Sequence, residues 1–297
     1  MTDSPMRGVF AVSTTAFTPD GALDLAMYGR SVERVLEAGV EGILALGATG
    51  EALALDDTER EAQVRHLLEV VDSRAKVIVG CMAYDPQAMS SMITQAHQWG
   101  AAGAMVTPSF YGGLPATDAV AALSPVLERS ELPVMVYNNP HSTGTDLLPE
   151  HLVPLLEYEA MWSVKETSGE ASRVRELRAA LGDDSEIFVG ADGIALEGFT
   201  QGASGWVAAS AWLAPASCVQ LWRYADAGDW VSAVALWDRL ADPLGQIESN
   251  SAFISLIKRS LGELGLDQGA VRAPLPTASD KDVDSLMAAL EKLGPIG

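Results

Sequence analysis

Short apolar runs alternate with longer amphipathic segments along most of this chain, and this alternation constrains the fold more than any other feature. Eight apolar runs predict strands, at 8–17, 42–46, 77–81, 104–107, 133–138, 161–165, 186–189 and 205–209. Amphipathic segments predict helices between and after them, at 24–38, 58–72, 86–99, 117–129, 170–181 and 213–227. The spacing of the strands fits βα units joined by short loops.

The number of units decides between the two common α/β architectures. Eight alternating units over about 220 residues favour a (β/α)8 TIM barrel over an open doubly wound sheet. The remaining sequence predicts additional C-terminal helices at 230–240, 251–264 and 281–293. We therefore expect residues 1–228 to form the barrel and residues 229–297 to form a helical extension packed on it.

Composition and charge exclude several classes of partner. The formal net charge is −21 and no basic patch occurs, so we expect no nucleic-acid partner. The start of the sequence has no apolar signal core, and no apolar run reaches the ~20 residues of a membrane helix. We therefore expect no membrane partner and a cytoplasmic location. Cys81 and Cys218 lie far apart in apolar stretches, which predicts reduced core residues and no metal site.

Lys165 ends one of the predicted strands, after the apolar run 161–164 and before a turn at 166–169. Of the five lysines, it alone occupies a core-like position in this pattern; Lys258, for example, falls on an amphipathic helix. Either Lys165 ends the strand and extends its amine to water, or the amine lies in an apolar cavity. A buried amine loses the hydration of its charged form, which makes the neutral nucleophile available for a Schiff base with a ketone.

Further polar motifs follow predicted strands at the end where barrel enzymes carry their functional residues. They are 47–51 (GATGE), 137–140 (YNNP), 141–144 (HSTG) and 190–193 (GADG). The glycine-rich loop either presents backbone amides to an anion or is an ordinary strand-to-helix turn. Tyr137 is either a proton shuttle or a core aromatic residue. His141 is a second acid–base candidate or a surface residue, and Asp192 is a helix cap or an acceptor for a substrate hydroxyl group.

Three of these segments, 47–51, 137–140 and 165–169 (KETSG), resemble the signatures of the dihydrodipicolinate synthase / N-acetylneuraminate lyase family in order and in spacing. The resemblance covers nearly the whole chain, including the C-terminal helices and the segment 271–275 (VRAPL). It implies a (β/α)8 barrel, usually in a homotetramer built as a dimer of dimers. It also implies a class I enzyme that uses neither a metal nor another cofactor.

The resemblance also implies roles for individual residues. Lys165 would form the Schiff base with pyruvate or another 2-oxo acid, and Tyr137 would be the acid–base group at the imine carbon. The amides of Ala48 and Thr49 would bind the substrate carboxylate, and the Thr49 hydroxyl would orient Tyr137. The other expected substrate-binding residues are Gly47, Phe110, Ser142, Thr167, Gly190 and Asp192.

Several positions depart from the pattern of the synthases. Ala48 replaces a frequent hydroxyl residue, and Phe110 stands where a neighbouring subunit's relay tyrosine is expected, although a shift of one residue would bring in Tyr111. Neither alanine nor phenylalanine can carry a proton. Ser142 stands in place of an arginine that binds the second substrate's distal carboxylate, and serine cannot replace that charged fork.

Other positions bear on the sugar-acid lyases of the family. Asp192-Gly193 differs from the Asp-Glu of the sialic acid lyases, whereas Thr167-Ser168 resembles the sugar-acid lyase branch. We therefore predict a Schiff-base lyase, an aldolase or dehydratase, that acts on a pyruvate-type 2-oxo acid or a deoxy sugar acid and forms a dimer or tetramer. The alternatives are a dihydrodipicolinate synthase with an altered proton relay, a deaminase of a cyclic imine acid, and a non-catalytic barrel that binds a keto acid.

Overall fold

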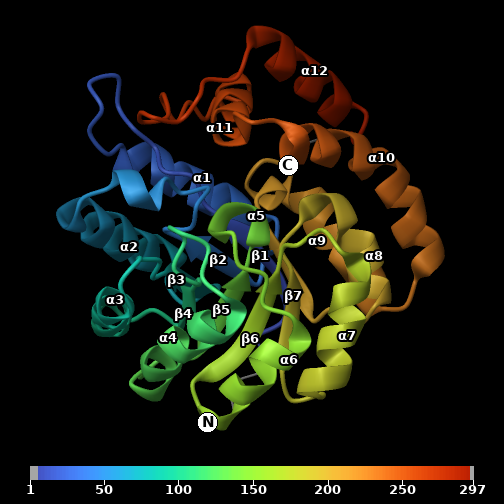
Figure 1. Ribbon diagram of the computed structural model, residues 1–297. Coiled ribbons are helices and arrows are strands. Elements are labelled where there is room, and N and C mark those ends of the chain that lie inside the picture. The colour runs from blue at the N-terminus through green and yellow to red at the C-terminus, as the bar shows by residue number, and fades with distance from the viewer. Residues whose placement is uncertain (1–5, 295–297) are drawn as a thin grey trace. The chain divides into compact units, whose positions relative to one another are not determined.

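A computed structural model describes residues 6–294, and it contains a closed barrel of eight strands in the order β1 to β8 (Figure 1). The predicted (β/α)8 barrel with additional C-terminal helices is therefore confirmed. By its internal contacts the chain divides into two compact units. The first comprises the described residues 6–7 and 76–207, and the second comprises residues 8–75 and 208–294.

The first unit carries most of the strands. Its elements are β3 (Lys76–Gly80), α3 (Pro86–Trp99), β4 (Gly103–Val106), α4 (Ala116–Glu128), β5 (Val134–Asn138), α5 (Pro140–Thr143), α6 (Pro149–Leu152), η2 (Val153–Glu157), β6 (Met161–Glu166), α7 (Ala171–Leu181), β7 (Glu186–Val189), η3 (Asp192–Ile194), α8 (Ala195–Thr200) and β8 (Gly205–Ala208). Strands β4, β5 and β7 are buried along their whole length, which explains their continuous apolar sequences. Local sequence sets the helix ends: α3 begins with Pro86 after the Asp85 cap and ends at Gly100 in the left-handed conformation.

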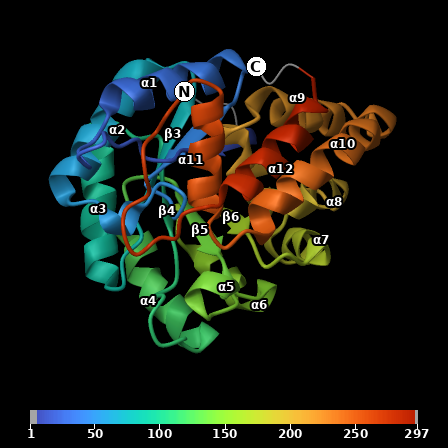
Figure 2. The same ribbon diagram turned by 90° about the horizontal axis from the view of Figure 1, so that it is seen from above.

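The second unit contains the first two strands and the C-terminal helices. Its elements are β1 (Gly8–Val12), α1 (Leu25–Glu37), β2 (Gly42–Ala45), η1 (Ala52–Ala54), α2 (Asp57–Val71), η4 (Ser210–Trp212), α9 (Pro215–Asp226), α10 (Trp230–Ser249), α11 (Phe253–Glu263) and α12 (Asp280–Glu291). A capping box between Asp56 and Glu59 starts α2. Helix α11 contacts α12, and both views show them side by side (Figure 2).

Two predicted boundaries were wrong by several residues. Strand β1 ends at Val12 instead of residue 17, because hydroxyl side chains follow it and form other contacts; Thr15, for example, donates to the Gly50 carbonyl at 2.6 Å. Helix α10 continues to Ser249 instead of ending at residue 240, and it includes Pro243. Within residues 6–294, no helix combines the length and the apolar character needed to cross a membrane.

Candidate active site

Neighbouring strands of the first unit bring Lys165 and Tyr137 together. Strands β5 and β6 pair in parallel with Tyr137 opposite Lys165, so both side chains lie on the same face of the sheet. The Lys165 amine lies 4.3 Å from the centre of the Tyr137 ring. Lys165 is 6 % exposed and Tyr137 is 8 % exposed, so the predicted burial of this lysine is confirmed. A buried amine in contact with a phenol has both a nucleophile and a proton carrier in one place.

The residues that directly follow these strands lie next to the pair. Asn139 follows β5, and its side-chain nitrogen lies 2.7 Å from the Tyr137 oxygen; Thr167 follows β6. Gly190 follows β7, and its amide donates to the Glu166 carbonyl at 2.7 Å. The Thr167 hydroxyl is buried and has no hydrogen-bond partner within the described part of the chain, which leaves it available to a ligand.

Gly190 provides space for the lysine. A Cβ atom at this position would lie 1.9 Å from the Thr167 hydroxyl oxygen and 2.7 Å from Lys165 Cε. Both distances are far shorter than a non-bonded contact, so any larger residue would displace one or both side chains. The sequence motif identifies this glycine, but only the pairing of β6 with β7 explains why a side chain is excluded there.

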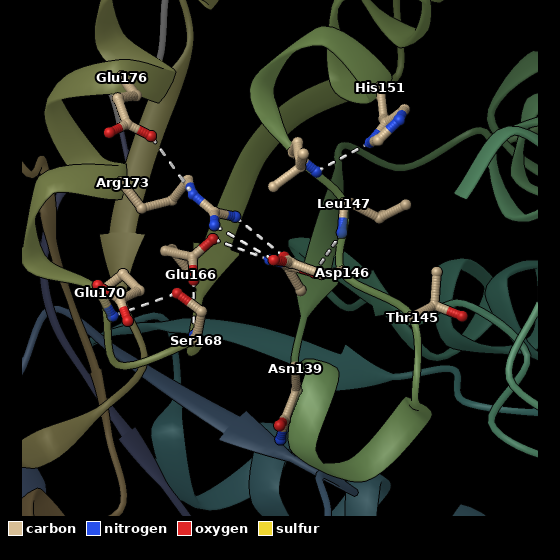
Figure 3. A network of polar contacts seen from close by, with 12 residues as sticks. Asn139, Thr145, Asp146, Leu147, His151, Glu166, Ser168, Glu170, Arg173 and Glu176 are labelled. Carbon is tan, nitrogen blue, oxygen red and sulfur yellow. Dashed lines mark hydrogen bonds and ion pairs between the residues drawn. The ribbon is translucent and has the colours of Figure 1, made fainter. Parts of the chain in front are cut away.

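A polar network lies on the opposite face of β5 and β6. Asn138 donates to Glu166 at 3.0 Å and to Asp146 at 2.9 Å, and Arg173 holds Asp146 with two hydrogen bonds (Figure 3). Burial favours a higher pKa for the Asp146 carboxyl, but the bonds from Arg173 and Asn138 outweigh this effect and hold the pKa below its usual value. The Ser168 amide donates to Glu166 at 2.6 Å. The network therefore joins the loop after β5 to the end of β6 and fixes the backbone around Lys165.

The loop after β5 carries Ser142 and His141, and both side chains are exposed. The Ser142 amide donates to Asn139, and a ring nitrogen of His141 lies 3.1 Å from the Ser168 carbonyl. In the same unit Phe110 is partly exposed, and the Tyr111 side chain is 80 % exposed with its ring edge-on to Tyr84.

Asp192 is buried and accepts a hydrogen bond from the Trp206 indole at 2.9 Å. The residue before it, Ala191, occupies the N-cap position of η3, so Asp192 is not the cap of that helix. The indole N–H keeps one oxygen of the carboxylate oriented. Asp192 therefore fits an acceptor of hydrogen bonds better than it fits a helix cap.

The glycine-rich loop belongs to the second unit. Gly47 and Thr49 are buried and Ala48 is exposed. The loop is closed by the amide of Gly50, which donates to the Gly47 carbonyl at 3.0 Å, and by the amide of Glu51, which donates to the Ala48 carbonyl at 3.1 Å. This compact turn fixes the backbone of the segment to which the family resemblance assigns the substrate carboxylate.

Glu51, the last residue of this motif, forms an ion pair with Lys258 of α11 at 2.9 Å, and both side chains are completely buried. The expectation that Lys165 alone lies in the core was therefore wrong: Lys258 is buried too, because a carboxylate from the glycine-rich motif neutralises it. Burial lowers the pKa of Lys258, and the charge of Glu51 opposes this effect. Glu51 also accepts from the Arg272 amide at 2.7 Å, so α11 and the following segment hold the end of the loop.

Residues 6–294 contain no group of three or more His, Cys, Asp or Glu side chains that could hold a metal ion. Cys81 and Cys218 are buried and do not form a disulfide. Tyr137, Asn139 and Thr167 contribute a phenol, an amide and a hydroxyl to this part of the site. These groups can transfer a proton, position a substrate and donate hydrogen bonds.

A closed barrel that buries a lysine against a tyrosine has the architecture of the lysine Schiff-base enzymes. The model of the Dihydrodipicolinate synthetase family matches residues 5–293. The chain therefore belongs to the dihydrodipicolinate synthetase family, and it is a class I, Schiff-base-forming lyase that acts on a 2-oxo acid. This class sets aside the alternative of a non-catalytic barrel.

Relatives and solved structures agree with this membership over nearly the full length. A 4-hydroxy-tetrahydrodipicolinate synthase of Xanthomonas campestris pv. campestris is 32 % identical over 97 % of this chain and 97 % of its own. A dihydrodipicolinate synthase of Thermotoga maritima superimposes with a TM-score of 0.93 at 27 % identity, covering 98 % of this chain and 99 % of its own. A chloride-inhibited dihydrodipicolinate synthase of Acinetobacter baumannii, solved in complex with pyruvate, gives a TM-score of 0.92 at 27 % identity and the same coverage.

Proposed function

We propose that Lys165 forms an imine with a pyruvate-type 2-oxo acid and that Tyr137 carries the protons of the reaction. The observation that carries this proposal is the position of the buried Lys165 amine, 4.3 Å from the centre of the Tyr137 ring. The surroundings of the lysine support it, because the missing side chain of Gly190 avoids a clash with Lys165 and Thr167. Within residues 6–294 the buried Thr167 hydroxyl has no hydrogen-bond partner, so it can bind a substrate.

The chemistry follows from these groups. The neutral amine of Lys165 adds to the carbonyl carbon, and a proton passes from nitrogen to oxygen to give a carbinolamine. Protonation of the carbinolamine oxygen and loss of water leave the protonated imine, which then accepts the electron pair of a breaking bond. The contact between the Tyr137 ring and the amine supports Tyr137 as the group that moves these protons.

The remaining predicted residues receive roles in binding. We assign the amides of Ala48 and Thr49, with Gly47, to the substrate carboxylate, and the Thr49 hydroxyl to the orientation of Tyr137, on the motif alone. We assign Thr167 and Asp192 to hydroxyl groups further along the substrate. The Thr167 hydroxyl has no hydrogen-bond partner within residues 6–294, and the Trp206 indole orients the Asp192 carboxylate. Hydroxyl recognition of this kind favours a deoxy sugar acid or a related hydroxylated compound.

Cleavage or dehydration is favoured over condensation by what the loop after β5 lacks. An anionic second substrate needs a permanently charged, bidentate partner, and this loop offers the exposed side chains of Ser142 and His141 instead. Phe110 likewise cannot carry a proton. A third outcome is the loss of ammonia from a cyclic imine acid after its ring opens. This reaction would pass through the same imine between the substrate and Lys165.

The second candidate function is condensation of the synthase type with an altered relay. It is favoured by one observation, namely that a relative 32 % identical over nearly the whole chain is a 4-hydroxy-tetrahydrodipicolinate synthase. The two candidates share Lys165 and Tyr137. The first candidate breaks a bond of a single 2-oxo acid, whereas the second joins pyruvate to another substrate. They also differ in the residues that would bind the part of the substrate that lies beyond the imine.

We also propose a cytoplasmic homo-oligomer, a dimer or a tetramer, because the family resemblance implies such assemblies. Within the chain, we assign catalysis to residues 1–228 and a supporting role to the helical extension 229–297. The ion pair between Glu51 and Lys258 supports this assignment, because Lys258 belongs to the extension and Glu51 ends the glycine-rich motif.

Reduction with borohydride tests the proposed function. The chain is incubated with pyruvate and with a panel of deoxy sugar 2-oxo acids, reduced, and mapped by peptide mass spectrometry. We expect an adduct on Lys165, which Lys165→Met abolishes and which substitution of the exposed Lys281 by Met leaves unchanged. A chain that gives no adduct with any of these acids does not have the proposed function.

A parallel assay separates the two candidates. Release of pyruvate from a deoxy sugar acid supports cleavage, and formation of a 2-oxo acid semialdehyde without release of pyruvate supports dehydration. Aspartate semialdehyde is the second substrate in a condensation of the synthase type. If pyruvate and aspartate semialdehyde are consumed together as fast as the deoxy sugar acids are, the reaction is instead the condensation.

A further inference from the structure

Asn139 directly follows β5, and its side chain contacts the hydroxyl group of Tyr137. The Asn139 side-chain nitrogen lies 2.7 Å from the Tyr137 oxygen, within hydrogen-bonding distance. On its other side, the Asn139 side-chain oxygen accepts from the Ser142 amide at 3.3 Å and caps the short helix α5. Asn139 thus connects the tyrosine to the first turn that follows β5.

This arrangement determines which way the Asn139 amide faces. A backbone N–H can only donate, so the atom that faces the Ser142 amide is the side-chain oxygen. The nitrogen must then face Tyr137, and the phenol oxygen accepts a hydrogen bond from it. Because the phenol has one hydrogen of its own, that hydrogen is left to point toward another acceptor.

The hydrogen bond from Asn139 affects Tyr137 most after the phenol has given up its proton. A phenolate next to an amide donor is stabilised by a charge-assisted hydrogen bond, whereas an apolar neighbour would provide none. The donor also fixes the phenol oxygen in place, so little reorganisation is needed when the proton moves. Asn139 is itself held by α5, where Pro140 occupies the first turn and Gly144 ends the helix in the left-handed conformation.

We propose that Asn139 is a positioning residue for the proton transfers of Tyr137. From its position just after β5 it supplies a hydrogen bond to the phenol that Ala48 and Phe110 cannot supply, because neither side chain has a polar group. This role presupposes the imine at Lys165 proposed above. It assigns a function to the third residue of the YNNP motif, which the family resemblance left without one.

Two substitutions isolate the donated hydrogen bond from the helix cap. Asn139→Ser is neutral and keeps a good N-cap residue, but its side chain is too short to reach the phenol. Asn139→Asp keeps both the cap and the shape, but it offers an acceptor in place of the donor. Asn250→Ser is the matched control, because Asn250 also accepts from a backbone amide, that of Ala252, at 2.8 Å, and lies in the second unit.

The measurement is the rate at which borohydride-trappable adduct forms on Lys165 with pyruvate. We expect Asn139→Ser to slow this rate about tenfold, the upper end of what one net hydrogen bond contributes, and Asn139→Asp to slow it at least as much. Thermal midpoints of both variants should stay close to that of the wild type, and Asn250→Ser should leave the rate unchanged.

Combining each substitution with Tyr137→Phe makes the test decisive. If Asn139 acts through the phenol, Asn139→Ser has no further effect once the hydroxyl is absent. An equal loss of rate in the Tyr137 and Phe backgrounds, or no loss in either, would overturn the assignment. A wild-type chain that forms no adduct at all would instead refute the proposed function, so the two failures are distinguishable.

Discussion

Replacing Gly190 with alanine adds one methyl group beside the proposed nucleophile and changes little else. The new Cβ atom would lie 1.9 Å from the Thr167 hydroxyl oxygen, 2.7 Å from Lys165 Cε and 2.9 Å from Lys165 Cγ. Gly190 does not have a left-handed backbone conformation, so alanine introduces no backbone strain of that kind. The effect of the substitution is therefore steric, and the three nearest atoms belong to these two side chains.

The expected magnitudes differ between stability and activity. Overpacking by one methyl group costs about 1–3 kcal/mol, and a rotation of Thr167 away from its rotamer costs about 0.5–1.5 kcal/mol. Lys165 cannot avoid the contact by rotating its end alone, because the clash involves Cγ as well as Cε. Moving a reacting atom by about 1 Å costs about a hundredfold in rate. We therefore expect a folded protein whose adduct forms about a hundredfold more slowly.

The assay combines the rate of adduct formation with pyruvate and the free energy of unfolding in urea. Gly245→Ala is the matched control: nothing lies within 4 Å of its Cβ position, so alanine should stabilise α10 by about 0.5–1 kcal/mol and leave the rate unchanged. Adding Thr167→Ala to Gly190→Ala should recover stability but not rate, since the contacts with Lys165 remain. Adduct formation by Gly190→Ala within about twofold of the wild-type rate would refute the reasoning, because a hundredfold loss is predicted.

Three further predictions follow from other contacts. Tyr137→Phe should lower turnover by about 10²–10⁴-fold with a much smaller change in ligand binding, and unchanged turnover would remove the phenol from the mechanism. Lys258→Met should lower the free energy of unfolding by about 3–5 kcal/mol, because it leaves Glu51 buried without its cation; calorimetry that finds less than about 1 kcal/mol would contradict this. The pKa of the Asp146 carboxyl is lowered in the folded chain, so its ionised form stabilises the fold. This stabilisation is complete above the pKa that the Asp146 carboxyl has in the unfolded chain, and it is lost as the pH falls through its pKa in the folded chain. Asp146→Asn should thus be less stable than the wild type at neutral pH, and urea titrations should show the difference shrinking below about pH 4; a constant difference would exclude Asp146 as its source.

The alternation of strands and helices was sufficient to predict the barrel, because strands buried on both faces leave short, continuous apolar runs in the sequence. Boundaries were less predictable where side chains rather than the backbone pattern end an element. Strand β1 stops at Val12 since the hydroxyl residues after it bond elsewhere, and α10 continues through Pro243.

In the site, local sequence patterns identify some residues, whereas the roles of others depend on contacts between distant parts of the chain. Lys165 and Tyr137 could be singled out as candidates because each is a polar residue that follows an apolar run near the end of its strand. The reason for Gly190 could not, since it depends on which residues of β6 and β7 are paired. The ion pair of Glu51 and Lys258 joins residues 207 positions apart, and no local pattern contains that information.

A crystal structure of the chain soaked with pyruvate shows whether Lys165 is the residue that forms the imine. We expect continuous electron density from the Lys165 nitrogen to carbon 2 of pyruvate, with the phenol of Tyr137 beside that carbon. Density that joins pyruvate to any other lysine, or a fully occupied ligand held away from an unmodified Lys165, would contradict it.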